Sequence, residues 1–274
     1  MRYRFSIITV CFNSEKTIEW TIKSLLAQSY ENYEYIIVDG GSTDSTMEIV
    51  NKYKDEFNNI QIISEPDKGI YDAMNKGIKI CRGELIGFLN SDDYYEPNAL
   101  EQINDNYAKD IDIIYGDTYF IDKYKDKIFE KKTEVYFIDE IKQGRMIPHT
   151  SAFVKGELMK KNLFDIEYKI VADYKFMLQL YLMDKNFSYI PYRINNMCIG
   201  GASTTQAKEL LTEYAKCQKE LLGQSIQNKI QIKLTCLKMK LKKDIALKVL
   251  KDETYIKFKY INKGWKVINW GEKW

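Results

Sequence analysis

The chain of 274 residues contains a single histidine, His149, and its five cysteines are scattered without the spacing of a metal site. One histidine offers no sign of a Ser-His-Asp arrangement for nucleophilic catalysis. An odd and unpatterned set of cysteines is typical of reduced thiols, so we expect a cytoplasmic protein. The cysteines are Cys11, Cys81, Cys198, Cys217 and Cys236.

Long apolar runs and common nucleotide-binding motifs are also missing. No stretch approaches the roughly 18 apolar residues that a membrane span needs. The first apolar run ends at Asn13 without a small-residue cleavage site, so we do not expect a signal peptide. Neither a Gly-x-Gly-x-x-Gly sequence after this run nor a Walker-type loop is found, which disfavours nicotinamide dehydrogenases and ATPases.

What the chain does contain is 45% hydrophobic and 14% aromatic residues, enough for one sizeable domain with a smaller appended unit. The net charge of +2 gives the whole chain no nucleic-acid signature. The charge is uneven, however, because the segment 229–274 has 13 lysines against 4 acidic residues, and the remainder has 28 basic and 35 acidic residues. A basic tail on an acidic body indicates an anionic partner for the tail.

Short apolar runs alternate with segments of helical periodicity through the first 115 residues, which predicts a mostly parallel sheet flanked by helices, an α/β fold of the Rossmann-like kind. The predicted strands are Phe5–Cys11, Tyr35–Val38, Ile60–Ile63, Leu85–Leu89 and Ile111–Tyr115. The predicted helices between them are 14–28, a segment around Met47–Tyr53, Ile70–Ile80 and Asn98–Tyr107. For the sequence after residue 115 we predict a hairpin at Tyr119–Phe129, a helix at Ala172–Met183, a strand at Phe187–Ile199 and a helical region after Gln206.

Polar residues follow the predicted parallel strands, at the edge where open parallel sheets bind ligands. They are Asn13, Asp39, the segment Glu65–Lys68 and the segment Asn90–Asp93. A single Asp after a strand is most often a helix cap or turn residue, and Asp44 fits that role. Asp39 is ambiguous, because the two glycines after it would let a ligand approach the backbone.

The segment Asn90–Asp93 is the stronger signal for a binding site. Two adjacent carboxylates at the end of a buried strand repel each other unless a cation or water neutralises them. Carboxylate oxygens suit Mg²⁺ or Mn²⁺, which keep some waters and bind substrate phosphates. A turn followed by a helix cap is the alternative interpretation of this tetrapeptide.

Five runs, in order along most of the first 200 residues, together resemble the family 2 inverting glycosyltransferases, which have the GT-A fold. The runs are Ser6–Asn13 (SIITVCFN), Val38–Ser45 (VDGGSTDS), Glu65–Gly77 (EPDKGIYDAMNKG), Phe88–Asp93 (FLNSDD) and Val171–Tyr174 (VADY). The third run is typical of a bacterial branch that makes surface polysaccharides. The fourth occupies the place of the Asp-x-Asp metal motif, with Asn90 instead of the first Asp.

The resemblance implies a sugar transfer from a nucleotide-sugar, with UDP the expected nucleotide, to an acceptor hydroxyl. It implies that Asp39 bonds the nucleobase and that Asp92 binds Mn²⁺ or Mg²⁺ at the donor diphosphate. The other donor-binding residues that it implies are Thr9, Asn13, Lys68, Asn75, Ser91 and Asp93. A relic that binds nucleotide-sugars without catalysis and a nucleotidyltransferase are the competing functions, although no Gly-rich basic loop follows the first strand.

Asp173 is implied as the general base that takes the proton of the attacking hydroxyl, a role typically worth about 10²–10⁴-fold in rate. Taken alone, Asp173 would be a carboxylate in the first turn of a helix, where the helix dipole stabilises its negative charge. His149, in the run IPHTSA, lies before the base, where the family faces its acceptor. Contact with the acceptor, the phosphates or the metal, and a purely structural role, stay open for this residue.

The basic C-terminal region combines aliphatic residues with lysines and three late tryptophans, a composition that suits an anionic membrane surface. A helix packed on the domain with a solvated lysine face is the alternative. We expect a GT-A domain over 1–203, with a donor half to 115 and an acceptor half from 116, and a basic helical region over 204–274. The expected location is cytoplasmic and peripheral on the inner membrane face. The expected acceptor is a glycan or a lipid-linked glycan, nucleic acid is not an expected partner, and the sequence leaves the oligomeric state open.

Overall fold

The computed structural model describes residues 3–124, 127–132, 138–199, 207–223 and 263–268. The chain divides into two compact units. The larger unit comprises Met1–Thr118 and Glu134–Met197, and the smaller unit comprises Tyr119–Thr133 and Cys198–Trp274. The division places the hairpin segment with the C-terminal region, so the larger unit alone carries the polar strand ends.

Four parallel strands form the centre of the larger unit, in the spatial order β4-β1-β2-β3. They are β1 (Tyr3–Cys11), β2 (Tyr33–Asp39), β3 (Ile60–Ser64) and β4 (Gly83–Phe88). Strands β1 and β2 are buried almost throughout, which is why both read as continuous apolar runs. The predicted α/β fold with a mostly parallel sheet is therefore confirmed.

The sheet continues past β4 with one strand that the sequence did not reveal. Strand β8 (Ala152–Lys155) pairs antiparallel with β4, and the start of β6 (Ile113–Tyr124) pairs antiparallel with β8. The predicted strand at Ile111–Tyr115 thus runs in the direction of β4 but is not its neighbour. A four-residue strand ending in lysine is too short to show a period, and this explains why β8 was missed.

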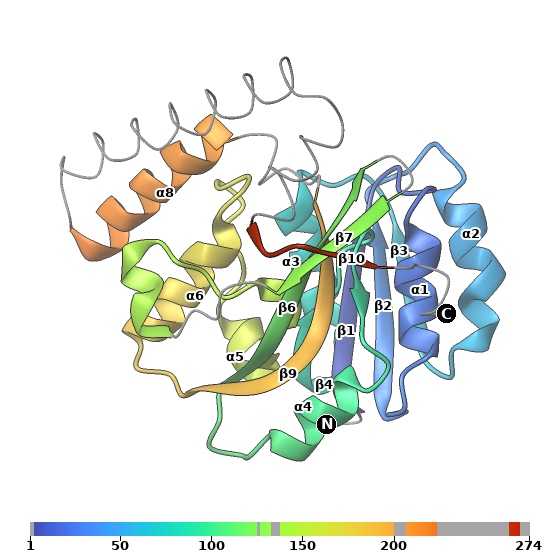
Figure 1. The fold of residues 1–274 in the computed structure, drawn as a ribbon, viewed down its shortest axis with the longest axis horizontal. Coiled ribbons are helices and arrows are strands. Elements are labelled where there is room, and N and C mark those ends of the chain that lie inside the picture. Colours follow the sequence, from blue (N-terminus) through green and yellow to red (C-terminus); the bar gives the residue numbers. More distant parts are fainter. Residues whose placement is uncertain (1–2, 125–126, 133–137, 200–206, 224–262, 269–274) are drawn as a thin grey trace. The chain divides into compact units, whose positions relative to one another are not determined.

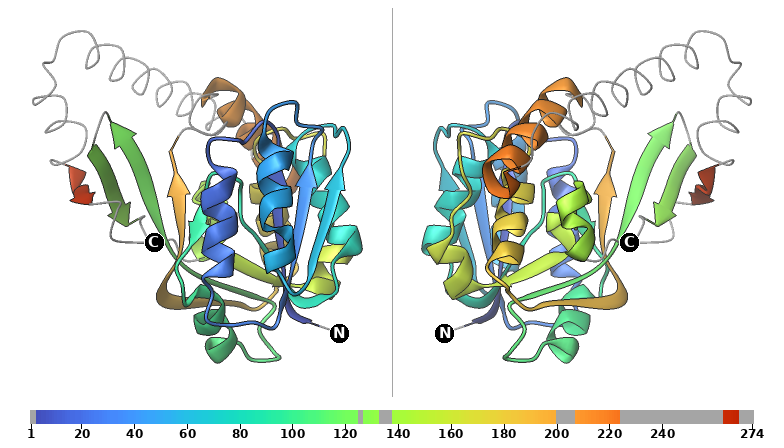
Figure 2. Two further views of the ribbon diagram at one scale, coloured as in Figure 1. Left: turned by 90° about the vertical axis from the view of Figure 1, so that its right-hand side faces the viewer. Right: turned by 90° about the vertical axis from the view of Figure 1, so that its left-hand side faces the viewer.

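Helices cover both faces of this sheet (Figures 1 and 2). They are α1 (Ile18–Leu26), α2 (Thr46–Tyr53), α3 (Ile70–Ile80), α4 (Ala99–Asn106), α5 (Gly156–Lys161) and α6 (Ala172–Leu182). Phe5 and Ile7 of β1 belong to the core that α1 and α2 close. Ile8, pointing the other way, lies against Gly77 of α3. Alternate residues of one strand therefore anchor helices on opposite faces.

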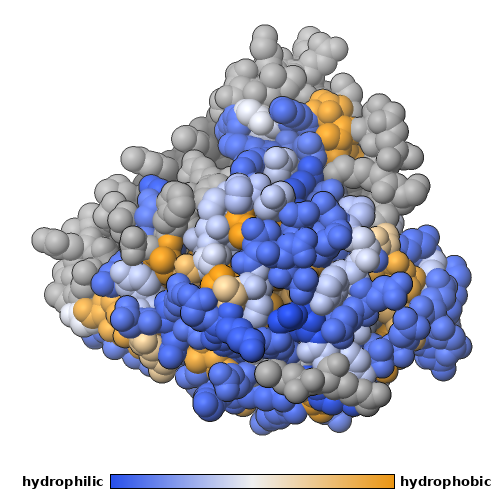
Figure 3. All heavy atoms as spheres, turned by 90° about the horizontal axis from the view of Figure 1, so that it is seen from below, coloured by the Kyte–Doolittle hydropathy of each residue, from blue (hydrophilic) through white to orange (hydrophobic). Residues whose placement is uncertain are grey.

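The remaining described strands of the larger unit are β5 (Tyr94–Tyr95) and β9 (Phe187–Cys198), which pair antiparallel with each other, and β9 also pairs with β6. The face drawn in Figure 3 is mainly hydrophilic, and its hydrophobic residues occur in small separate groups. This distribution is ordinary for the surface of a folded domain.

The smaller unit contains the predicted hairpin, in which the end of β6 pairs with β7 (Lys127–Lys132). Helix α8 (Ala207–Leu222) confirms the predicted helix after Gln206. The prediction of helix is wrong at Lys266–Ile268, which form strand β10 beside β7, because hydrogen bonding to the hairpin edge outweighs the local sequence. The predicted amphipathic segment 230–250 lies outside the described residues. Among the described residues, no helix is long and apolar enough to cross a membrane.

Candidate active site

The loops that follow β1, β2 and β4 are joined by hydrogen bonds at the carboxyl edge of the sheet. The side-chain oxygen of Asn13 accepts a hydrogen bond from the Thr43 backbone amide at 2.9 Å, and the backbone amide of Asn13 donates to Ser42 Oγ at 2.8 Å. The hydroxyls of Ser14 and Ser91 lie 2.9 Å apart. Asn13 has a φ of 49°, a left-handed conformation that asparagine tolerates better than most residues. The structure thus brings Asn13 and Ser91 into one connected group of loops.

Asp39 ends β2 with a fully buried side chain. Its carboxylate accepts from the amides of Gly41 and Ser42 at 3.1–3.2 Å and from the Ser64 hydroxyl at 2.7 Å. Asp39 therefore holds the loop after β2 in shape. Burial and the neighbouring Asp39 carboxylate raise the pKa of the Cys11 thiol, so this cysteine stays protonated and unreactive.

Thr9, Lys68 and Asn75 lie in different surroundings from one another. Thr9 is fully buried within β1 and accepts from the Tyr35 hydroxyl at 3.1 Å. Lys68 is exposed in the loop before α3. The Asn75 amide is 6% exposed and bonds both the amide and the carbonyl of Phe164, each at 2.9 Å. The contacts of these three residues with a donor stay predictions. The two hydrogen bonds to the Phe164 backbone also give Asn75 a structural role.

The segment Asn90–Asp93 forms a tight turn after β4. The Asp93 amide donates to the Asn90 carbonyl at 3.1 Å, and the Thr21 hydroxyl donates to the Asp93 carbonyl at 2.7 Å. Asp93 is 1% exposed, and the Asn90 side-chain amide donates to its carboxylate at 3.1 Å. Asn90, which departs from the metal motif, thus supplies a hydrogen bond where an aspartate would add a third carboxylate to the turn.

Of the two carboxylates in this turn, Asp92 is the one that is partly open to solvent, as Asn90 and Ser91 also are. Burial raises the pKa of Asp92 above its ordinary value, and a backbone hydrogen bond and the nearby His149 offset only part of that rise. Among the described residues, no three His, Cys, Asp or Glu side chains are arranged to hold a metal ion by themselves. The single carboxylate of Asp92 nevertheless fits Mg²⁺ or Mn²⁺, because these ions take further ligands from water and phosphate.

Asp173 lies in the first turn of α6 and is 7% exposed. One carboxylate oxygen, Oδ2, lies 2.9 Å from Nδ1 of His149. The other, Oδ1, accepts from the Tyr71 hydroxyl at 3.0 Å and from the Tyr174 amide at 2.9 Å. The far side of the imidazole, Nε2, faces Asn90 Oδ1 at 3.5 Å. One histidine therefore lies between the predicted base and the predicted metal turn.

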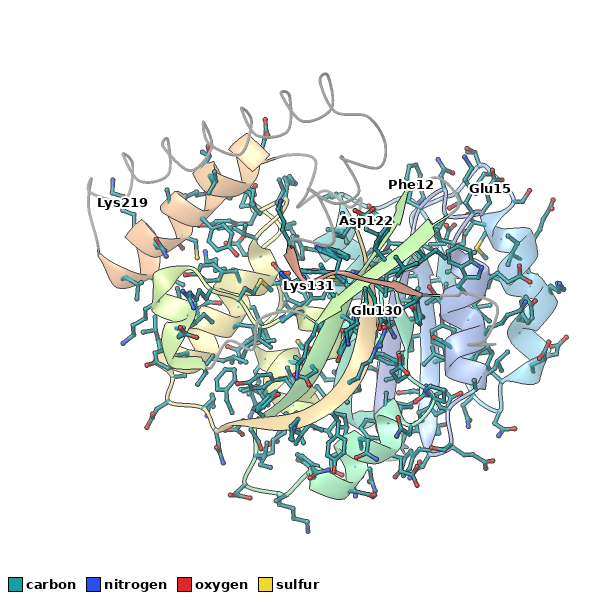
Figure 4. All side chains as sticks on the ribbon, in the orientation of Figure 1. Phe12, Glu15, Asp122, Glu130, Lys131 and Lys219 are labelled. Carbon is teal, nitrogen blue, oxygen red and sulfur yellow. The ribbon has the colours of Figure 1, made fainter. Side chains whose placement is uncertain are left out.

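Two residues near the site lie within the quoted runs, but the sequence assigned them no role. Tyr71 reaches Asp173 from 102 positions away, a contact that only the fold creates. Phe12 is 61% exposed on the loop after β1, which also carries Glu15 (Figure 4). A side chain on Gly40 would come within 3.4 Å of the Phe12 ring, so this aromatic face lies beside the loop that Asp39 holds.

Comparison with known proteins identifies the family. A model described as glycosyl transferase family 2 matches residues 6–165, more than half of the chain. The chain belongs to glycosyl transferase family 2. An uncharacterised glycosyltransferase of Methanocaldococcus jannaschii is 30% identical over 207 residues, which are 70% of this chain and 71% of that protein.

Another curated relative is named for the biosynthesis of a surface polymer. The minor teichoic acid biosynthesis protein GgaA of Bacillus subtilis is 31% identical over 68% of this chain and 45% of its own length. Several curated relatives are much longer, and the chain spans between 16% and 45% of three of them.

Two solved structures share the GT-A fold with the chain. TarS 1–349 of S. aureus in complex with UDP-GlcNAc has a TM-score of 0.63 and 20% identity over 92% of this chain and 77% of that one. The mannosyltransferase PcManGT of Pyrobaculum calidifontis, in complex with GDP-Man and Mn²⁺, has a TM-score of 0.59 and 16% identity over 79% of this chain and 64% of that one. The fold and the family predicted from the sequence are both confirmed.

Proposed function

We propose that this glycosyltransferase moves a sugar from a UDP-sugar to an acceptor hydroxyl with inversion, in the biosynthesis of a surface polysaccharide. The observation that carries the proposal is the position of His149, which contacts Asp173 at 2.9 Å and faces Asn90 at 3.5 Å. A donor diphosphate at the turn Asn90–Asp93 and an acceptor hydroxyl at Asp173 would then meet across one imidazole. A direct displacement would then require the acceptor hydroxyl and the anomeric carbon to align between these two parts of the site.

The donor half of the site follows from the loops at the carboxyl edge of the sheet. Asp39 is the proposed hydrogen-bond acceptor for the uracil, which would replace one of the bonds that this buried carboxylate makes to Ser42 and Ser64. The exposed ring of Phe12 offers a face on which the base can stack. Thr9, Asn13, Lys68, Asn75, Ser91 and Asp93 complete the proposed donor contacts. Bound at Asp92, Mg²⁺ or Mn²⁺ would supply positive charge against the leaving diphosphate.

Asp173 takes the role of general base in this proposal. Its carboxylate is held by Tyr71, Tyr174 and His149, so it cannot rotate away from the reacting hydroxyl. The hydroxyl proton passes to the carboxylate as the oxygen attacks the anomeric carbon from the face opposite the leaving group. The product therefore has inverted anomeric configuration.

The proposed acceptor is a glycan or a lipid-linked glycan at the inner face of the cell membrane. The relationship to a teichoic acid biosynthesis protein supports a surface polymer as the product. The 13 lysines of 229–274, interleaved with apolar residues, support contact with anionic lipid. A membrane location would place the site beside acceptors that carry a lipid.

A donor panel tests the proposed function. Calorimetric binding and slow hydrolysis of UDP-, GDP- and dTDP-sugars would be measured with and without Mn²⁺, on the wild type and on Asp92→Ala. We expect one UDP-sugar to bind with an affinity that Mn²⁺ increases, and Asp92→Ala to remove that increase. Failure of every donor to bind would contradict the proposal and favour a role without sugar transfer.

A further inference from the structure

The Asp173 carboxylate has unequal partners on its two oxygens. At Oδ1, the Tyr71 hydroxyl lies 3.0 Å away, but the same hydroxyl lies 2.7 Å from the Ile170 carbonyl. A phenolic hydroxyl has one proton, so Tyr71 must share it between two acceptors, and the shorter contact is with the carbonyl. Oδ2 lies 2.9 Å from Nδ1 of His149. His149 is therefore the side-chain donor most fully committed to Asp173.

The backbone around His149 is fixed by buried hydrogen bonds. His149 begins a 3₁₀ turn, His149–Ser151, in which the Ser151 amide and hydroxyl both bond the Pro148 carbonyl at 3.0 Å. The next residue, Thr150, is fully buried and accepts from Asn195 at 2.6 Å, and Asn195 accepts from Thr118 at 2.7 Å. These hydrogen bonds connect the residue after His149 to β9 and β6, so the backbone that carries the imidazole is held in place.

We propose that His149 is a positioning residue for Asp173, holding the carboxylate in its reactive orientation through Nδ1–H. The inference rests on the proposed function, because it assumes that Asp173 is the base. A carboxylate hydrogen-bonded to Nδ1 fixes which ring nitrogen carries the proton. The imidazole orients the base, and Nε2 is directed toward the Asn90 side of the site.

The kinetic test uses hydrolysis of the donor that the panel identifies, with His149→Ala, His149→Asn, Tyr71→Phe and Asp173→Asn. A misplaced reacting group costs about 10²-fold, so we expect His149→Ala to lower kcat by roughly 10–100-fold. Asparagine places an amide N–H near the position of Nδ1, so His149→Asn should recover most of that loss. Tyr71→Phe, which removes only a shared proton, should have the smaller effect.

Binding of UDP with Mn²⁺, measured by calorimetry, separates positioning from ligand contact. We expect the dissociation constant of His149→Ala to stay within about 2-fold of the wild type, where a direct contact would cost tenfold or more. Near-normal kcat in His149→Ala, or equal loss in His149→Asn, would overturn the inference. Asp173→Asn separates the proposed function from this inference. If Asp173→Asn remains active, Asp173 is not the base. If Asp173→Asn is inactive while His149→Ala keeps near-normal kcat, Asp173 is still the base and only the role of His149 is wrong.

A spectroscopic test needs no donor. Because His149 is the only histidine of the chain, ¹⁵N-histidine labelling gives one imidazole in the NMR spectrum of the full-length protein. We expect a proton on Nδ1 in the wild type and loss of that preference in Asp173→Ala. A ring that carries its proton on Nε2 alone, or a ring unchanged by Asp173→Ala, would contradict the proposed contact.

Discussion

At the scale of single residues, the turn Asn90–Asp93 places two carboxylates side by side after a buried strand. Asp93 is buried and receives a hydrogen bond from Asn90, and Asp92 remains partly open to solvent. The neutral side-chain amide of Asn90 donates a hydrogen bond to the Asp93 carboxylate and so stabilises the turn without a cation. The substitution in the metal motif is thus compatible with a folded site and leaves Asp92 available to a metal.

Replacing Asn90 by aspartate should destabilise the protein. The new carboxylate would lie about 3 Å from the buried Asp93 carboxylate, in place of a donor, at a cost of roughly 1–3 kcal/mol in the free energy of unfolding. Denaturant unfolding at pH 8 without metal measures this cost. Asn58→Asp, on an exposed residue, is the matched control and should be nearly neutral. Equal stability of Asn90→Asp and the control would contradict the role given to Asn90.

Asp92→Asn should have the opposite effect on the metal-free protein. Burial raises the pKa of Asp92, so at neutral pH the folded state bears the cost of an ionised carboxylate that the unfolded state does not bear. Removing that charge should stabilise the protein at pH 7–8 by about 0.5–2 kcal/mol. The gain should shrink as the pH falls into the carboxyl range, where Asp92 is protonated in both states. Thermal unfolding across pH measures it, and a gain that grows in acid would refute the argument.

The sequence located the strand-end residues of the site but not their mutual contacts. Asp39, Asp92 and Asp93 could be predicted at the edge of the sheet, because parallel strands with short apolar runs end there together. The contact of Asp173 with His149 joins residues 24 positions apart on separate elements, and Tyr71 comes from another helix. Local periodicity carries no information about such packing.

At the scale of elements, helix α3 and strand β1 meet at Gly77. A methyl group on Gly77 would lie 2.6 Å from Cγ2 of the buried Ile8, closer than real contacts allow. Ile8 is β-branched and held in β1, so it has little room to move. The glycine therefore sets the distance between the helix and the sheet, and with it the position of Tyr71 near the start of α3.

Gly77→Ala should destabilise the protein even though alanine is the better helix former. The propensity gain of about 1 kcal/mol is offset by overpacking, which typically costs 1–3 kcal/mol. We expect a net loss of up to about 2 kcal/mol in the free energy of unfolding, measured with denaturant. Lys79→Ala, at an exposed position of the same helix, is the control and should change stability by less than about 0.5 kcal/mol. A stabilised Gly77→Ala variant would show that α3 can shift freely.

The longer elements of the fold were predictable, and the short ones were not. Helices α3 and α6 and the four parallel strands match their predicted ranges closely, since each has a clear apolar period or run. Strand β8 and helix α5 span four and six residues, too few to show a period. Strand β10 forms only because β7 offers an edge to pair with, which is a tertiary effect.

At the scale of the whole molecule, the segment 229–274 concentrates 13 lysines and distinguishes this chain from a donor-binding domain alone. We expect the 274-residue chain to bind vesicles containing phosphatidylglycerol, and to lose that binding as salt rises. Replacing Lys233, Lys238, Lys240, Lys242 and Lys243 with glutamine should weaken binding at least tenfold, at about 1 kcal/mol per lysine near the surface. Co-sedimentation measures it, and equal binding to neutral phosphatidylcholine vesicles would contradict the electrostatic account.

Catalysis by Asp173 is the central claim about the molecule as an enzyme, and Asp173→Asn tests it most directly. Donor hydrolysis and donor binding would be measured on the same preparation of the 274-residue chain. The account predicts that turnover falls by about 10²–10⁴-fold while the dissociation constant of the donor with Mn²⁺ stays within a few-fold of the wild type. Near-normal turnover in Asp173→Asn would show that another group takes the proton and that the proposed base is wrong.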